Sequence, residues 1–314
     1  MSQRVVYFNG NFVPETAARV SIYDAGLTTG DMAFEVSRTY NHEPFRLSEH
    51  IGRLFHSLAS LRVDPGVTAD ELDRLTRSTL ERNLATESRD VDWNVIHNVS
   101  SGPAEMFRDA FAADELHPTL VISCFPLVQK LGVLAPAYFS GVDLVVPTQR
   151  SLPPDLLDPS IKIRSRLHYH FANFQARDIC AGAWPVLVDP AGFLTESTSA
   201  NVFLVRRDQV CTPREGNVLA GVTRGVIIEL AAELGIPTVE TDLTPEDALE
   251  ASEVFLTSTS IGIVHARSFE GRPIGDGRLG PVALQLREAF SRAVGLDFVE
   301  QACGYARKLG VDVP

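Results

Sequence analysis

Positive charge is scarce in this sequence of 314 residues. Lysine and arginine together number 28, against 40 aspartate and glutamate residues, which gives a net charge of −12 and a pI near 5.1. A nucleic-acid partner needs a basic face that contacts phosphate groups, so this balance argues against one. The length suggests two domains or one large domain, with ample material for a core.

Long apolar runs and cysteine pairs are also missing. No apolar run approaches the roughly 20 residues needed to span a bilayer, and the opening MSQRVVYFNGNFVP is a polar turn between short apolar runs, not a secretory signal. The four cysteines have no CxxC spacing, which is typical of reduced, structural thiols; they are Cys124, Cys180, Cys211 and Cys303. We therefore expect a cytoplasmic protein with no membrane partner.

Lysine is the scarcest charged residue, with three copies against twenty-five arginines. One copy, Lys162, stands between Ile161 and Ile163. It is either a strand residue whose ammonium group reaches water, or a desolvated amine of lowered pKa that acts as a Schiff-base nucleophile. The first alternative is the commoner one for an isolated lysine, because most charged side chains are solvated. The choice therefore depends on the other motifs.

The first part of the chain predicts a small domain over residues 1–128. Asn9-Gly10 between two apolar runs predicts a β-hairpin. Apolar residues recur at helical spacing over 47–61, where Ser48 is the expected N-cap, and again over 69–84. Further apolar runs predict strands, the first of them a strand or a buried helix: 32–40, 95–99 and 119–125.

Residues 129–138, which contain glycine, proline and the polar pair Gln129-Lys130, are the expected linker to a larger domain over 139–314. Strands are expected over 142–146, 184–188, 202–205, 209–211 and 253–256. Helices are expected after the Lys162 segment to about residue 181, over 223–234, and over 281–290 with a proline in the first turn. Because strands cluster with few helices in each half, the pattern favours an α+β fold over a doubly wound sheet.

The segment Gly275-Asp-Gly-Arg-Leu-Gly280 matches the dinucleotide-binding pattern GxGxxG. That reading requires a parallel strand before it, and after it a helix and another strand that carries an acidic residue. The chain ends soon after one helix, so we interpret the segment as a turn.

His168 and His170 could form a metal pair at i, i+2 spacing. No carboxylate or cysteine lies nearby with ligand spacing, and Arg164 and Arg166 would repel a cation. We expect no metal here.

Three features could bind an anion, although each has a commoner structural explanation. Gly221-Val-Thr-Arg224 opens a helix, where backbone N–H groups point outward. The stretch Leu256-Thr-Ser-Thr-Ser-Ile-Gly262 ends a strand in a hydroxyl-rich loop, and Arg53 could supply a counter-charge.

Glu196 follows a hairpin strand among hydroxyl residues; it is a solvated turn carboxylate or one that faces a heterocyclic nitrogen.

Taken in order, nine motifs resemble the class IV pyridoxal-phosphate (PLP) aminotransferases. That family comprises branched-chain and D-amino-acid aminotransferases, (R)-selective amine transaminases and aminodeoxychorismate lyase. The motifs cover nearly the whole chain: YFNGNFVP, DAGLTTGD, FEVSR, EHIGRL, the Ile161-Lys162 pair, LTESTSANVF, LAGVTR, FLTSTS and GDGRLGPV. The resemblance implies fold type IV, with a small α+β N-terminal domain, a larger pseudo-barrel C-terminal domain, the cofactor between them, and a homodimer.

The resemblance also implies a role for each matching residue. Lys162 would form the internal aldimine with PLP and shuttle the proton at the substrate α-carbon. Glu196 would pair with the protonated pyridine nitrogen and keep the ring an electron sink. The phosphate would be held by Arg53, the Val222 amide, Thr223 and Thr259. The substrate would be bound by Phe34, Arg38 and the amides around Ser260 and Ile261.

The substrate side departs from the subfamilies. Branched-chain enzymes carry a tyrosine five residues after the lysine, where this chain has Leu167, with His168 or Tyr169 as substitutes. The Arg and His that D-amino-acid enzymes place after the strand at 95–99 are replaced by Ser100-Ser-Gly-Pro-Ala104, and the Arg-Pro of branched-chain enzymes near that strand is also missing. Phe34-Glu35-x-x-Arg38 follows the branched-chain pattern.

Arg164 and Arg166, just after the lysine, are unusual for the family. They are either part of a salt-bridged helix start or a different clamp for a carboxylate. Because a planar guanidinium suits a carboxylate, Arg38 is the first expected partner of the keto acid.

These features predict a PLP-dependent transaminase that moves an amino group from an amino acid, with a branched-chain L-amino acid favoured, to 2-oxoglutarate or pyruvate. The alternatives are a D-amino-acid or (R)-amine transaminase and aminodeoxychorismate lyase. Outside enzymes, the alternative is a binding protein that kept the fold and lost the chemistry, against which the presence of Lys162, Glu196 and Arg53 argues.

Overall fold

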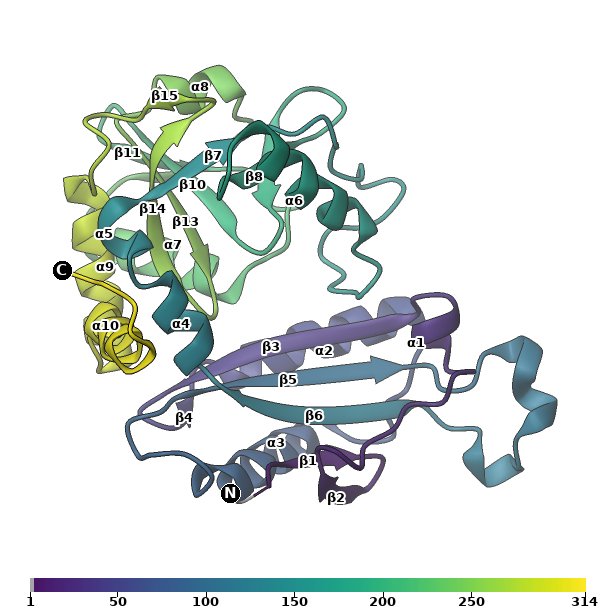
Figure 1. Ribbon diagram of the computed structural model, residues 1–314. Helices are drawn as coiled ribbons and strands as arrows, with labels where there is room; N and C mark the ends of the chain where they lie inside the picture. Colours follow the sequence, from purple (N-terminus) through teal and green to yellow (C-terminus); the bar gives the residue numbers. More distant parts are fainter. Residues whose placement is uncertain (1–2) are drawn as a thin grey trace. The chain divides into compact units, whose positions relative to one another are not determined.

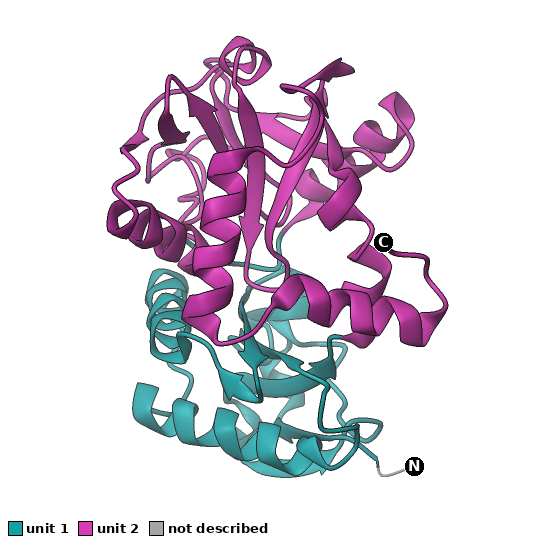
Figure 2. Ribbon diagram, turned by 90° about the vertical axis from the view of Figure 1, so that its left-hand side faces the viewer, with its two compact units in different colours: residues 1–127, 161–165 teal, residues 128–160, 166–314 magenta. Residues whose placement is uncertain are grey.

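The computed structural model describes residues 3–314 and divides them into two compact units (Figure 2). Unit 1 holds the residues through Leu127 together with the short segment Ile161–Ser165; unit 2 holds Val128–Ser160 and Arg166–Pro314. The predicted boundary at residue 128 lies next to this division. The Lys162 segment, however, groups with the N-terminal unit, because its backbone hydrogen-bonds to a strand of that unit.

Unit 1 is built on one antiparallel sheet of six strands in the order β2-β1-β6-β5-β3-β4 (Figure 1). The strands are β1 Val5–Phe8, β2 Asn11–Pro14, β3 Met32–Tyr40, β4 Glu43–Pro44, β5 Trp93–Ser100 and β6 Thr119–Pro126. The helices are α1 Ala25–Thr28, α2 Leu47–Leu61 and α3 Ala69–Leu84, with short 3₁₀ turns at Glu105–Ala110 and Ala113–Glu115. The segment predicted as strand or buried helix is therefore a strand, and the Asn9-Gly10 hairpin is confirmed.

Helices α2 and α3 cover one face of this sheet (Figure 1). Their apolar stripes meet the sheet in a core that includes Leu54, Leu58, Leu72, Trp93 and Ile122. Both helices begin and end where the apolar spacing predicts. The predicted N-cap Ser48 is wrong, since α2 starts from residue 46 in left-handed conformation with no side-chain cap.

Unit 2 contains a sheet in the order β12-β11-β10-β13-β14-β7-β8-β9, with β15 beside β14. An extra pairing of β9 with β10 closes six of these strands into a barrel. The strands are β7 Val142–Val145, β8 Trp184–Val188, β9 Leu194–Ser197, β10 Asn201–Arg206, β11 Gln209–Thr212, β12 Thr238–Glu240, β13 Glu253–Ser258, β14 Gly262–Phe269 and β15 Arg272–Pro273. The α+β prediction is confirmed.

The helices of unit 2 are α4 Val128–Leu134, α5 Ala137–Ser140, α6 Leu167–Ile179, α7 Val222–Glu233, α8 Pro245–Leu249, α9 Pro281–Val294 and α10 Phe298–Leu309. Helices α4 and α5 occupy the stretch predicted as a linker. Within residues 3–314, no helix has both the length and the apolar character that a membrane crossing requires.

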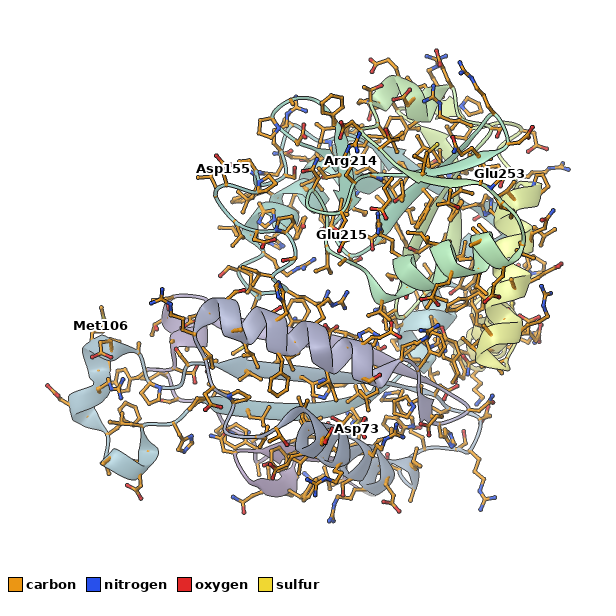
Figure 3. The ribbon with its side chains drawn as sticks, turned by 180° about the vertical axis from the view of Figure 1, so that it is seen from behind. Asp73, Met106, Asp155, Arg214, Glu215 and Glu253 are labelled. Atoms are coloured by element: carbon orange, nitrogen blue, oxygen red, sulfur yellow. The ribbon has the colours of Figure 1, made fainter. Side chains whose placement is uncertain are left out.

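The GxGxxG segment is a turn, as predicted. Gly275 and Gly277 have φ of +56° and +77°, and β15 before them pairs antiparallel with β14, so there is no βαβ unit. Gly280, the last residue of the motif, is instead the N-cap of helix α9. The Glu253 carboxylate on β13 accepts hydrogen bonds from the Val282 and Ala283 amides at 2.9 and 2.8 Å and so caps α9 (Figure 3).

Candidate active site

In unit 1, the Lys162 segment lies extended along the first residues of β3. The Phe34 amide donates to the Lys162 carbonyl at 3.0 Å, and the Arg164 amide donates to the Met32 carbonyl at 2.9 Å. From α2, the Ser57 hydroxyl accepts the Lys162 amide at 3.0 Å. The lysine is half-buried, and its ammonium nitrogen lies 4.9 Å from the centroid of the Phe34 ring. Its backbone is therefore fixed, while its amine lies against an aromatic face.

Arg53 of α2 forms a bidentate ion pair with Glu35 of β3. Its Nε and Nη2 donate to the two carboxylate oxygens at 2.8 and 2.7 Å, and His50 Nδ1 lies 3.1 Å from the same carboxylate. Burial alone would raise the pKa of Glu35, but the Arg53 charge and these hydrogen bonds outweigh it and hold that pKa well below its usual range. Glu35 thus stays ionised and fixes the plane of the Arg53 guanidinium.

The expected carboxylate partner Arg38 is buried on the face of β3 that carries Phe34. Its guanidinium carbon lies 4.0 Å from the centroid of the Tyr40 ring, and its Nε donates to the Thr39 carbonyl at 3.1 Å. Arg38 lies four positions after Phe34, which is about 13 Å along an extended strand.

In unit 2, three donors from three segments hold the Glu196 carboxylate. The Tyr169 hydroxyl of α6 donates to Oε1 at 2.7 Å, while the Asn201 side-chain amide and the Leu219 backbone amide donate to Oε2, each at 3.2 Å. Burial, then the negative charge of Glu196, raises the pKa of Tyr169 well above its usual value, so Tyr169 remains a donor. Glu196 is thus oriented, unlike a solvated turn carboxylate.

The remaining predicted cofactor residues lie close to Glu196 within unit 2. The strand register sets Asn201 opposite both Glu196 on β9 and Thr257 on β13. Helix α7 starts beside them, since a Cβ added at its N-cap Gly221 would meet the Asn201 side-chain oxygen at 2.1 Å. A side chain at this position would require Asn201 to move. Val222 and Thr223, in the first turn of α7, are buried, as expected for an enclosed anion site at a helix N-terminus.

The hydroxyl-rich loop follows β13 at the same end of the sheet. Ser260 and Ile261 are buried and Thr259 is half-buried. The Tyr138 hydroxyl donates to the Ile261 carbonyl at 2.7 Å, and Arg287 in turn donates to the Tyr138 carbonyl at 3.0 Å. Tyr138 therefore braces the loop at Ile261.

Sequence reasoning missed three supporting residues: Glu35, Tyr169 and Tyr138. The signal for Glu35 was present, because it alternates with Phe34 along β3 and so faces the helix that carries Arg53. Tyr169 was considered only as a substitute for a tyrosine at position 167. Nothing in the sequence connects Tyr138 with residue 261.

Comparison with known proteins decides the family. The chain matches the model for "Amino-transferase class IV" over residues 32–269. The chain belongs to the class IV aminotransferases. This membership makes it a PLP-dependent aminotransferase of fold type IV.

Individual class IV relatives cover almost the whole chain. A putative branched-chain-amino-acid aminotransferase of Methanocaldococcus jannaschii is 34% identical over 287 residues, 91% of this chain and 94% of that protein. A D-alanine aminotransferase of Bacillus licheniformis is 28% identical and covers 92% and 96%. The crystal structure of Escherichia coli branched-chain amino acid aminotransferase superposes with a TM-score of 0.81 at 27% identity, covering 92% and 93%.

The residues of this class IV chain fit PLP by their chemistry. Lys162 is a half-buried amine, and Glu196 is a carboxylate held by three donors. The start of α7 approaches Asn201 so closely that a side chain at Gly221 would displace the Asn201 amide. An amine for the aldehyde, a carboxylate for the pyridine nitrogen and a helix start for the phosphate are therefore all present.

Proposed function

We propose that the protein transfers the amino group of a branched-chain L-amino acid to 2-oxoglutarate or pyruvate. The observation that carries the proposal is the Lys162 segment, whose backbone is anchored on β3 and α2 while its amine lies over the Phe34 ring. When bound, PLP serves as the electron sink that makes the proton on the substrate α-carbon removable. Lys162 would bind the aldehyde carbon and carry that proton between carbon atoms.

Other residues would hold the cofactor in position. Glu196 would accept a hydrogen bond from the pyridine N–H and keep the proton there. The phosphate would be bound by the charge of Arg53, the Val222 amide and the hydroxyls of Thr223 and Thr259. The ion pair with Glu35 supports this role for Arg53, because a guanidinium of fixed plane loses little freedom on binding.

The branched-chain preference is supported by the residues around the lysine. Phe34 is an apolar residue beside the lysine, although buried, and a branched side chain next to it would leave no charge unpaired. The amides of Ser260 and Ile261, in the braced loop, would bind the substrate carboxylate. For the buried Arg38, stacked on Tyr40, we propose a structural role in β3.

We further propose that the protein is a cytoplasmic homodimer. Helix α6 carries Leu167, Phe171 and Phe174 at i, i+4 and i+7 spacing, with 63%, 47% and 49% of their surface exposed. One apolar stripe on a helix is typical of a covered surface. All four cysteines are free thiols, which supports a reducing compartment.

The test is a panel of donors offered to the PLP-loaded protein, with the visible absorbance of the cofactor as readout. The proposal predicts that L-leucine, L-isoleucine and L-valine bleach the visible band. It also predicts that borohydride, added before any amino donor, links the cofactor covalently to Lys162, which mass spectrometry of the peptides detects. Bleaching by D-alanine alone would support D-amino-acid transamination, which the Bacillus licheniformis relative makes the second candidate. A label on any other residue, or no label, would reject Lys162.

A further inference from the structure

Two cationic side chains of unit 1 lie against one aromatic ring. Lys162 and Arg164 are two residues apart on an extended segment, so their side chains project to the same side. The lysine nitrogen is 4.9 Å and the arginine guanidinium carbon 3.8 Å from the centroid of the Phe34 ring. Arg164 is the basic residue nearest to Lys162 in the sequence, and it contacts the same aromatic ring as Lys162.

Arg164 is held in a defined orientation although it is exposed. Its Nε donates to the Asn98 side-chain oxygen at 2.8 Å, and its backbone amide donates to Met32. Asn98 stands directly opposite Phe34 in the β3–β5 register, so ring and amide belong to neighbouring strands of one rigid sheet. A guanidinium that is stacked and hydrogen-bonded at Nε is held in a fixed plane, and a planar guanidinium suits a carboxylate.

Arg38 and Arg53, the other arginines considered for the site in unit 1, have different surroundings. Arg38 is buried and stacked on Tyr40, about 13 Å along β3 from Phe34 at the usual rise per residue. Arg53 is paired with Glu35 through two hydrogen bonds. Arg164 is therefore the exposed arginine beside Lys162.

We infer that Arg164 adds a charged contact to the substrate α-carboxylate, beyond the neutral amides proposed at Ser260 and Ile261, and restricts the enzyme to donors that carry a carboxylate on the amine-bearing carbon. The reason is position: the α-carboxylate is one bond from the carbon that Lys162 serves, and Arg164 lies on the same ring as Lys162. A simple amine lacks a carboxylate and therefore cannot pair with the Arg164 guanidinium. The inference rests on the proposed role of Lys162 and concerns substrate class, whichever side chain or stereochemistry the substrate has.

The test compares two matched probes that differ only in charge, 4-methylvalerate and its neutral amide. Their Kd values for the PLP-loaded protein are read from the change in the visible spectrum. Wild-type protein should bind the acid more tightly than the amide. In Arg164→Gln, the Kd of the acid should rise about 10- to 100-fold, which corresponds to about 1.4–2.8 kcal/mol at 1.4 kcal/mol per factor of ten, while that of the amide changes less than about twofold.

Two controls separate recognition from folding. Arg74→Gln removes the same charge from an exposed position on α3 and should leave both Kd values unchanged. Added methylguanidinium should restore part of the acid affinity to Arg164→Ala. An equal loss for acid and amide, no loss for either, or a wild type without preference for the acid would overturn the inference. Failure of the proposed function is a separate result, namely a donor panel in which no branched-chain amino acid reacts.

Discussion

At the scale of single residues, Tyr169 makes a contact that the sequence does not suggest. Its hydroxyl reaches the Glu196 carboxylate, whereas Leu167, five residues after the lysine, is exposed. Because Glu196 is proposed to face the pyridine nitrogen, Tyr169 is a positioning residue for that contact. It fixes one carboxylate oxygen, while Asn201 and Leu219 fix the other.

Replacing Tyr169 by Phe should therefore weaken PLP binding by about three- to tenfold, the effect of one hydrogen bond of roughly 1 kcal/mol. The measurement is a PLP titration of the apo protein, repeated with a 1-deaza analogue that has carbon in place of the pyridine nitrogen. The analogue should bind Tyr169→Phe and wild type alike. Equal weakening for both cofactors would mean that Tyr169 shapes the site without acting through Glu196.

The pair Glu35–Arg53 should matter for stability as well as for the site. Glu35→Gln leaves Arg53 without its buried countercharge, which costs on the order of 3–5 kcal/mol. The free energy of unfolding, measured with urea in the absence of PLP, should fall by that order. Glu43→Gln breaks another Glu–Arg pair, with Arg77, whose side chains are 70% and 46% exposed, and should cost less than about 1 kcal/mol. Equal effects would contradict the buried pair's role.

His97 gives unit 1 a dependence on pH. Thr76 donates its hydroxyl to the Leu72 carbonyl, so its oxygen accepts the His97 Nε2 hydrogen at 2.8 Å, and Nδ1 has no partner among the residues described. Burial lowers the pKa of His97 to about 4, with Glu35 and His50 as further charges nearby. A proton on Nδ1 would be buried without an acceptor.

Between pH 7 and pH 4, the unfolded chain takes up a proton at this histidine, whose unperturbed pKa is about 6.5, before the folded chain does. The free energy of unfolding should therefore decrease as pH falls through this window, by up to roughly 3 kcal/mol from this residue. In His97→Gln, which keeps a donor toward Thr76, this contribution should vanish. Stability curves of variant and wild type that run parallel from pH 7 to pH 4 would refute it.

At the scale of elements, apolar periodicity correctly predicts the helices whose position is set by the local sequence. Residues 47–61 and 69–84 form helices because one stripe of each packs on the sheet. Helix α10 was not predicted, although Asp297 caps its start and Gly310 ends it. Strand β14 was not predicted either, since a short apolar run buried on both faces has no period of two.

Helix α4 forms in the predicted linker through tertiary packing. Gly132, which argued for a linker, lets α4 approach α10: a Cβ there would meet Leu309 Cδ1 at 2.7 Å and the Tyr305 backbone at 3.0 Å. Residue-level patterns could not predict this contact, because α10 lies far along the chain. The same limit applies to Tyr138, which nothing in the sequence connects with Ile261, whereas the alternation along β3 does offer a signal for Glu35.

Gly132→Ala should destabilise the protein by about 1–3 kcal/mol, because the added methyl group forces two packed helices apart. Helix propensity alone predicts the opposite, a gain of up to about 1 kcal/mol. Gly304→Ala in α10, where a Cβ would meet nothing within 4 Å, is the matched control and should show that gain. The measurement is the free energy of unfolding of both variants. A stabilised Gly132→Ala would mean that α4 and α10 leave room for the added methyl group.

At the scale of the whole molecule, the exposed apolar stripe of α6 suggests a covering partner. Stable protein interfaces bury about 800 Å² on each side, usually around aromatic anchors, and Phe171 and Phe174 lie next to each other on the helix surface at i and i+3. In a symmetric homodimer, the stripe of each copy would be buried against the partner copy, so both would be removed from water. The net charge of −12 per chain makes adventitious association through other surfaces unfavourable.

If α6 forms the proposed dimer interface, the double variant Phe171→Glu, Phe174→Glu should be monomeric at concentrations where the wild type dimerises, because carboxylates buried at an interface lack countercharges. Light scattering coupled to gel filtration gives the mass directly, with 34.3 kDa expected for one chain. Leu284→Glu places the same charge on an exposed apolar position of α9 and should leave the dimer intact. A wild type of single-chain mass, or a double variant that still dimerises, would show that α6 is covered by something other than a second copy.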